Sequence, residues 1–242
     1  MKKMAKEWKN SNEWFDENVV ENVEELLEVG KITNVILKDK LNLGITSPKS
    51  TIAYYAIIFN CICEAIIEQE DKWDDFCVNV ADRIKVGYTT TSSEDDEKSG
   101  NFMVFIQHVY NTSTDESLDE EEEDTVVLCT QWNAANVKAQ TEIIKNIAAR
   151  GKKAFKELIN LPIETHELII PLFCIIHSQL INYIRLKRVE QNKTEYELEI
   201  AGLFTVGIRE TDEADEEVYF IPSVALKRLF KNDAIATGKH DE

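Results

Sequence analysis

The residues best suited to chemistry are carboxylates, and they are concentrated in two short stretches. Residues 115–124 read DESLDEEEED, and residues 210–217 read ETDEADEE. Carboxylate oxygens are good ligands for Ca²⁺ and Mg²⁺, but a calcium-binding loop needs alternating ligands around a glycine turn. Neither stretch has a glycine or that spacing. We therefore predict no dedicated metal site and no cofactor.

Cysteine and histidine are present, but without the spacing of a zinc site or a catalytic site. Cys61 and Cys63 lie two residues apart in a helix-like apolar run, so their side chains point in different directions. The stretch THELIIP begins like a zinc-protease helix but lacks the second histidine of that motif. We interpret His166 as a helix-start residue, and His108 and His177 as core histidines.

Other motifs that would indicate an enzyme are missing from the sequence. It has neither a glycine-rich phosphate loop nor a Gly-x-Ser-x-Gly elbow, and it contains only eight glycines. The number of cysteines is odd and their neighbours are apolar, which indicates reduced core thiols. The basic N-terminal segment MKKMAKEWKN has no apolar signal core. We expect a cytoplasmic protein (in the host cytoplasm or in the virion if it is viral) that is not secreted.

Two long apolar runs, residues 51–67 and 168–184, raise the question of a membrane. Both are shorter than the roughly 20 apolar residues of a spanning helix, and both contain polar side chains. We predict that they are buried helices of a core, and we expect no membrane contact.

The sequence matches itself when it is displaced by 118 residues without a gap. Over the 45 positions from Trp14 to Ile58, 11 residues are identical. Trp14 falls on Trp132, and KDKLNLGI (38–45) lies over KELINLPI (156–163). Two amphipathic helices of similar composition can align by chance, but this match extends over several predicted elements. We therefore predict an internal duplication, with a first unit over residues 1–131 and a second over 132–242.

Each unit is predicted to contain two helices, a long buried helix and a β-hairpin with an acidic tip. The fold class is therefore α+β and mainly helical. The predicted helices cover residues 11–30, 51–70, 133–150, 166–188 and 223–232, and the predicted strands 102–110, 125–132, 196–210 and 218–222. Ser11 and Asn12 are the expected N-caps of the first helix, Gly30 its expected end, and Gly151 an expected break.

The first unit is predicted to carry two further segments. Residues 71–88 look like an additional amphipathic helix, and residues 89–124 like an acidic loop. In the second unit the acidic loop is residues 210–217, and residues 233–242 form a frayed tail. The two acidic loops are interpreted as equivalent hairpin tips.

The charge of the chain is strongly segregated. The net charge is −18, but residues 89–124 hold 12 acidic residues against one lysine, and residues 210–217 hold six acidic residues. The rest of the chain is nearly neutral and includes a basic stretch between Lys138 and Lys156. Separate acidic and basic faces suit head-to-tail association of subunits. Alternatively, the lysines are only the solvated face of an amphipathic helix.

These observations predict a non-enzymatic structural or interaction protein. We expect a subunit of a homo- or hetero-oligomer, such as a bacteriophage virion or assembly component, without direct contact to nucleic acid. The expected contact residues are Asp119, Glu120, Glu121, Glu122, Glu123, Asp124, Asp212, Glu213, Asp215, Glu216 and Glu217 on the acidic side, and Lys145, Arg150, Lys152, Lys153 and Lys156 on the basic side. The alternatives are an acidic inhibitor or nucleic-acid mimic that binds a basic protein, and a metal-dependent enzyme.

Overall fold

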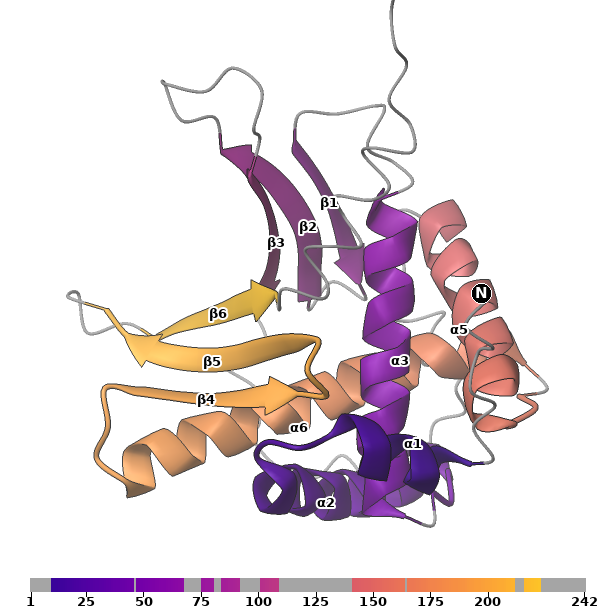
Figure 1. Ribbon diagram of the computed structural model, residues 1–242, viewed down its shortest axis with the longest axis horizontal. Helices are drawn as coiled ribbons and strands as arrows, with labels where there is room; N and C mark the ends of the chain where they lie inside the picture. The colour runs from indigo at the N-terminus through magenta and orange to yellow at the C-terminus, as the bar shows by residue number, and fades with distance from the viewer. Residues whose placement is uncertain are drawn as a thin grey trace, which may run out of the picture.

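The computed structural model describes residues 10–45, 47–67, 75–80, 84–91, 101–108, 141–163, 165–211 and 216–222. These residues form a mainly helical α+β fold, as predicted (Figure 1). The elements are α1 (Ser11–Asn18), α2 (Val23–Leu41), α3 (Pro48–Ile67), β1 (Asp75–Val80), β2 (Ile84–Thr91), β3 (Asn101–His108), α5 (Thr141–Ile159), a short 3-10 helix η2 (His166–Leu168), α6 (Ile169–Glu190), β4 (Glu195–Ile200), β5 (Phe204–Glu210) and β6 (Glu216–Pro222). The predicted strand 125–132, helix 223–232 and tail 233–242 lie outside these residues.

The two long apolar helices, α3 and α6, form the centre of the molecule, which confirms the prediction of buried helices. They cross in contact with each other (Figure 1). At the crossing the rings of Tyr55 and Phe173 stack with centroids 5.3 Å apart, and the Tyr55 hydroxyl is hydrogen-bonded to His177 Nδ1 at 2.7 Å. Phe59 lies over Phe204 of β5 with centroids 4.1 Å apart. All five side chains are fully buried, so they lock the two helices and the second sheet together.

One hydrophobic core runs through both halves of the chain. It includes Leu26 and Leu37 of α2, Phe155 of α5, and Val206 of β5. The amphipathic helix α2 packs against both α3 and α6, and α5 does the same from the other side. Each amphipathic helix thus buries its apolar stripe against two long helices, one from each half.

The ends of α2 and α5 have the same local structure. The two helices are equally long, and both bounds of α5 lie 118 residues after those of α2. Asn42 and Asn160 follow them in the left-handed conformation, with φ of 52° and 51°. The next amide closes each end: Leu43 N–H donates to the Leu37 carbonyl at 3.1 Å, and Leu161 N–H to the Phe155 carbonyl at 3.0 Å. Asparagine tolerates this conformation better than most residues, which explains its presence at both positions.

Two three-stranded antiparallel sheets complete the fold, with strand orders β1-β2-β3 and β4-β5-β6. The second sheet packs one face on α6, burying Leu198, Ile200, Phe204, Val206 and Ile208. The strands β3 and β6 lie close to each other, so the two sheets adjoin (Figure 1). The predicted strands 102–110 and 218–222 are confirmed, and the predicted strand 196–210 is the tight hairpin of β4 and β5.

The predicted helix over residues 71–88 is wrong, because this segment contains β1 and β2. Its apolar residues recur at every second position, as Phe76, Val78 and Val80, and again as Ile84, Val86 and Tyr88. That period belongs to a strand. In consequence β3 is the third strand of the first sheet, paired with β2. Residues 119–124 lie outside the described residues, so their interpretation as an acidic hairpin tip stays a prediction.

The predicted helix over residues 11–30 is wrong in its bounds. Asn10, rather than Ser11 or Asn12, is the N-cap of α1; its Oδ1 accepts from the Asn12 and Glu13 amides at 3.0 Å. The helix ends at Asn18, whose side-chain amide donates to the Trp14 carbonyl at 2.7 Å and competes with the helical ladder. A second helix, α2, then starts at Val23.

Gly30 and Gly151 do not end helices, since α2 and α5 continue through them. Instead they mark close contacts between helices. A Cβ atom on Gly30 would lie 2.5 Å from the Pro48 carbonyl oxygen, and one on Gly151 would lie 2.8 Å from Ile169 Cγ2. The first contact is with backbone, which cannot rotate away.

We predict that Gly30→Ala destabilises the protein by about 1–3 kcal/mol, because the added methyl group forces α2 away from the start of α3. Gly44→Ala is the control, since a Cβ atom there meets nothing within 4 Å. The midpoints of urea denaturation measure both effects. An unchanged midpoint for Gly30→Ala would contradict the close contact.

Candidate functional site

The described residues form a cleft of about 550 Å³ beside α5. Its walls are α3 and α5, with α1 and the β4–β5 turn at its ends. It is lined by Trp14, Ala56, Ile57, Asn60, Cys61, Glu64, Asn146, Arg150, Lys153, Ala154, Glu157, Leu158 and Leu203. We call this the α5 cleft.

The floor of the α5 cleft is apolar, and its rim is charged. Trp14, Ile57 and Cys61 are buried in the floor, and Leu158 is 37% exposed at the edge. Arg150 and Lys153 oppose Glu64 and Glu157 on the rim. An apolar floor with a polar rim is a composition found both in protein-binding surfaces and in small-molecule pockets.

A chain of polar contacts crosses the α5 cleft from α3 to α5. The Asn60 side-chain amide donates to Glu64 Oε1 at 2.9 Å, and Arg150 Nη1 lies 3.6 Å from Glu64 Oε2. Arg150 Nε in turn donates to Asn146 Oδ1 at 3.1 Å. These contacts hold the Arg150 guanidinium at the mouth of the cleft. Asn60 and Glu64 were not predicted as site residues, although their four-residue spacing in an otherwise apolar helix is a signal for a polar face.

Cys61 is not an activated nucleophile. Burial, together with the neighbouring Glu64 carboxylate, raises the pKa of its thiol to about 12. Burial raises the pKa of the Cys63 thiol further still. A reactive cysteine requires the opposite shift. Cys61, Cys63 and Cys174 are buried and unbridged, which agrees with their interpretation as core thiols.

The predicted basic contact residues all lie on α5, but they differ in availability. Lys145 lies 3.0 Å from Glu142, and Lys153 lies 4.0 Å from Glu157; both lysines remain more than half exposed. Lys156 is exposed, Lys152 is half-buried, and Arg150 is held by Glu64. Exposed ion pairs of this kind exchange readily with solvent, since they contribute little free energy. The lysines can therefore change partners.

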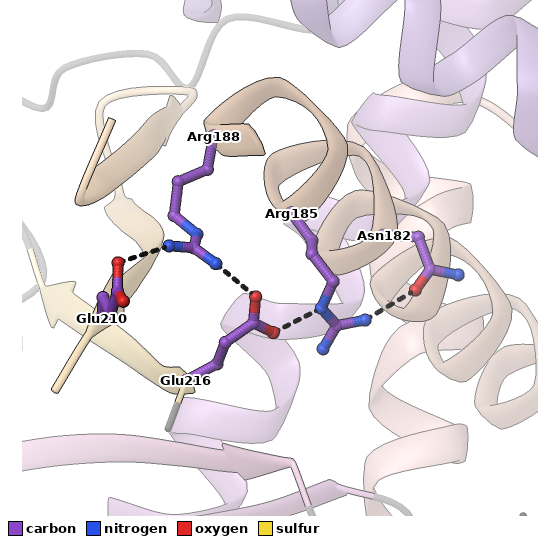
Figure 2. A network of polar contacts seen from close by, with 5 residues as sticks. All are labelled: Asn182, Arg185, Arg188, Glu210 and Glu216. Atoms are coloured by element: carbon purple, nitrogen blue, oxygen red, sulfur yellow. Dashed lines mark hydrogen bonds and ion pairs between the residues drawn. The ribbon is translucent and has the colours of Figure 1, made fainter. Parts of the chain in front are cut away.

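The predicted acidic contact residues are only partly described. Asp119–Asp124, Asp212, Glu213 and Asp215 lie outside the described residues. Glu216 accepts from Arg185 Nε at 2.6 Å and from Arg188 Nη2 at 2.5 Å (Figure 2). Glu217 accepts from Arg209 Nε at 2.7 Å. Both carboxylates are therefore engaged within the protein.

Figure 2 shows how this network fastens the second sheet to the end of α6. Arg188 projects between the strand ends and also contacts Glu210 at 3.4 Å, while Arg185 lies 3.4 Å from Asn182 Oδ1. The side chain of Arg188 is only 10% exposed. Glu210 ends β5 and Glu216 begins β6, so the two arginines fix the positions at which the chain leaves and re-enters the sheet.

The predicted histidines are not brought together. His177 is buried at the α3–α6 crossing, and His166 is exposed at the start of η2, where Thr165 is the N-cap. The side chain of His108 is not described. Within the described ranges no three His, Cys, Asp or Glu side chains converge on a point that could hold a metal ion.

The described part of the chain has one helix long and apolar enough to cross a membrane, residues His166–Glu190. Of its most apolar window, 67% is buried inside the protein. Contact with α2, α3 and the second sheet accounts for this apolar composition.

Comparison with known proteins gives no relative to reason from. No protein family matches the chain, and neither the curated proteins nor the solved structures contain a significant match.

We predict that Glu216→Gln destabilises the protein by about 1–3 kcal/mol at neutral pH, because it weakens charged hydrogen bonds to two arginines. Glu217→Gln is the control and should cost about 0–1 kcal/mol, since the Arg209–Glu217 pair is roughly half exposed. Chemical denaturation measures both. Equal effects of the two substitutions would contradict the anchoring role.

The loss of stability caused by Glu216→Gln should also depend on pH. Burial raises the pKa of Glu216, but the hydrogen bonds and charges of Arg185 and Arg188 outweigh it, so the pKa lies below its usual value. A lowered folded pKa stabilises the fold above the unfolded pKa of about 4.3, and this contribution is lost as the pH falls through the folded value. The stability curves of the wild type and Glu216→Gln should therefore converge under acid; a constant difference would refute the assignment.

Proposed function

We propose that this protein is a non-enzymatic interaction subunit that associates head to tail. In this arrangement the acidic β5–β6 connection of one copy binds α5 of the next. The observation that carries the proposal is the position of the two charged elements. The end of β5 and the start of β6 lie at the opposite end of the long axis of the molecule from the helix α5 (Figure 1). An acidic connection therefore cannot reach the α5 of its own copy, but can reach that of a neighbour.

The charge of α5 supports this role. Its 19 residues contain five basic and two acidic residues, whereas α2, with the same length and matching ends, contains three basic and four acidic residues. Solubility alone does not require this difference, because both helices bury one face and expose the other. In a chain with a net charge of −18, a basic helix is a natural partner for an acidic segment.

The α5 cleft provides the apolar part of such a contact. Charged pairs at a solvated rim set orientation and association rate but add little affinity. Leu158 offers exposed apolar surface in the same cleft as Lys153, so a docked segment can bury side chains as well as pair charges.

The contact residues are refined from the sequence-based set. Glu216 and Glu217 serve the internal network, so we assign the contact to Asp212, Glu213 and Asp215, which lie between Glu210 and Glu216 in the sequence. On α5 we assign the contact to Lys152, Lys153 and Lys156, which lie in the C-terminal half of the helix, as Leu158 does. The acidic run Asp119–Asp124 stays in the proposal as a second, sequence-based contact segment.

We further propose that the chain arose by internal duplication of a unit of two helices and a three-stranded sheet. The ungapped match at 118 residues supports it, as do the matching bounds of α2 and α5 and the equivalent backbone hydrogen bonds after Asn42 and Asn160. The identical strand orders of the two sheets add to this support. Duplication followed by divergence would explain why only one of the two amphipathic helices is basic.

Light scattering at low and high salt tests the association. We expect assemblies at low ionic strength that dissociate in about 0.5–1 M salt, because exposed charge pairs are then screened. The double variant Lys153→Glu/Lys156→Glu should remain monomeric at low salt.

The matched control is Lys31→Glu/Lys38→Glu, which makes the same change of charge on two exposed lysines of α2. This variant should assemble like the wild type. A wild type that is monomeric at every salt concentration, or equal effects of the two double variants, would refute the proposal.

A further inference from the structure

The outer edge of β4 is an open backbone edge. In the described sheet β4 pairs only with β5, and no strand lies on its other side. Glu210 N–H donates to the Thr194 carbonyl at 2.8 Å, so Thr194 and Glu210 form a hydrogen-bonded pair. Because such pairs alternate along an antiparallel ladder, the amides and carbonyls of Glu195, Glu197 and Glu199 point away from β5.

One contact confirms this direction and limits the open length. The Glu199 amide donates to Asn22 Oδ1 at 2.9 Å, so the edge is capped there from the α1–α2 connection. Asn22 has a left-handed backbone and makes no side-chain cap for α2, because its side chain is directed at β4. The backbone groups of Glu195 and Glu197 remain as the open part of the edge.

A groove runs along this open part. It has a volume of about 600 Å³ and is lined by Asn22, Glu25, Gln191, Lys193, Glu195, Tyr196 and Glu197. Three of these residues are acidic and one is basic. The lysine is turned toward an aromatic ring, with Lys193 Nζ 5.2 Å from the centroid of Tyr196. The pKa of Tyr196 is raised, first by burial of the phenol and second by the negative charge of the nearby Glu25 carboxylate. The groove therefore has a negative potential.

The carboxylates beside the edge are positioned rather than free. Tyr219 of β6 lies across Gly207 of β5, where a Cβ atom would be 2.2 Å from the tyrosine Cζ. Glycine at this position lets the ring pass over the middle strand. The Tyr219 hydroxyl then contacts Glu195 Oε1 and lies 2.8 Å from Glu197 Oε2. A phenol has one proton, so it can donate to only one of two carboxylates at a time. The two carboxylates of Glu195 and Glu197 therefore favour a further cation beside them.

We propose that the β4 edge binds an extended peptide segment whose lysine or arginine side chains alternate with apolar ones, added as a further antiparallel or parallel strand. The backbone of the segment pairs with Glu195 and Glu197, and its basic side chains lie beside their carboxylates. A second copy of β4 is excluded as the occupant, because its glutamates would lie directly against these. The site goes beyond the head-to-tail contact, which uses the β5–β6 connection and α5 rather than the edge of β4.

Fluorescence anisotropy with a labelled peptide of about five residues, in which Lys alternates with Val, tests the proposal. We expect binding by the full chain at low salt, and a loss of roughly 3- to 10-fold in affinity for Glu195→Gln/Glu197→Gln. The matched control Glu142→Gln/Glu157→Gln removes the same charge from α5 and should leave the affinity unchanged.

Backbone methylation separates strand pairing from simple charge attraction. Methyl groups on the peptide amides of one alternating set, which face β4, should abolish binding, while methyl groups on the other set should not. Absence of binding up to millimolar peptide, or equal binding of both methylated peptides, would overturn the proposal.

Discussion

The contact between α3 and α6 is the interaction on which the other layers depend. Its aromatic side chains are fully buried, and they include one polar pair, Tyr55 and His177, joined at 2.7 Å. Sliding one helix past the other would break this bond and leave buried polar atoms unbonded, at a cost of about 1–3 kcal/mol. The crossing is thereby held in one register. Because each half contributes one long helix, the halves share a single core, and α2 and α5 each pack against both long helices. This core in turn fixes the positions of α5 and of the second sheet, which both pack on it.

Several features of the fold could be read from the sequence because one physical signal dominated them. The long helices follow from apolar runs, and the strand 102–110 from β-branched and aromatic residues. The helix predicted for residues 71–88 is wrong because the alternating pattern of a strand is short there and interrupted by charged residues. The helix end predicted at Gly30 is wrong because a single sequence does not distinguish a glycine that ends a helix from a glycine that allows another backbone to approach closely. The α5 cleft could not be predicted, since it depends on how α1 and the β4–β5 turn meet α3 and α5. The basic face of α5 was visible, but the pairing of Arg150 with Glu64 across helices was not.

The acidic residues of the second sheet have two different physical roles. Glu210, Glu216 and Glu217 sit beside arginines and hold the strand ends in place, so they contribute to stability. Glu195 and Glu197 face outward at an open edge, where repulsion of like charges also discourages edge-to-edge aggregation. A sum of charge over the sequence does not separate these roles. Only the partners of each carboxylate decide its role: Glu216 and Glu217 pair with arginines, whereas Glu195 and Glu197 contact the Tyr219 hydroxyl at the edge of the sheet.

Complementation between two defective variants tests the head-to-tail arrangement most directly. One variant, Asp212→Asn/Glu213→Gln/Asp215→Asn, loses the acidic connection but keeps α5; the other, Lys153→Glu/Lys156→Glu, keeps the connection but loses the basic helix. In both variants the acidic side chains of residues 119–124 are also replaced by amides, so that the β5–β6 connection is the only acidic contact segment tested. Each should be monomeric alone in sedimentation velocity at low salt. Mixed in equal amounts, they should form a dimer and nothing larger, because a single intact contact joins them and both outer ends are blocked. A mixture that stays monomeric, or either variant assembling alone like the wild type, would contradict the account.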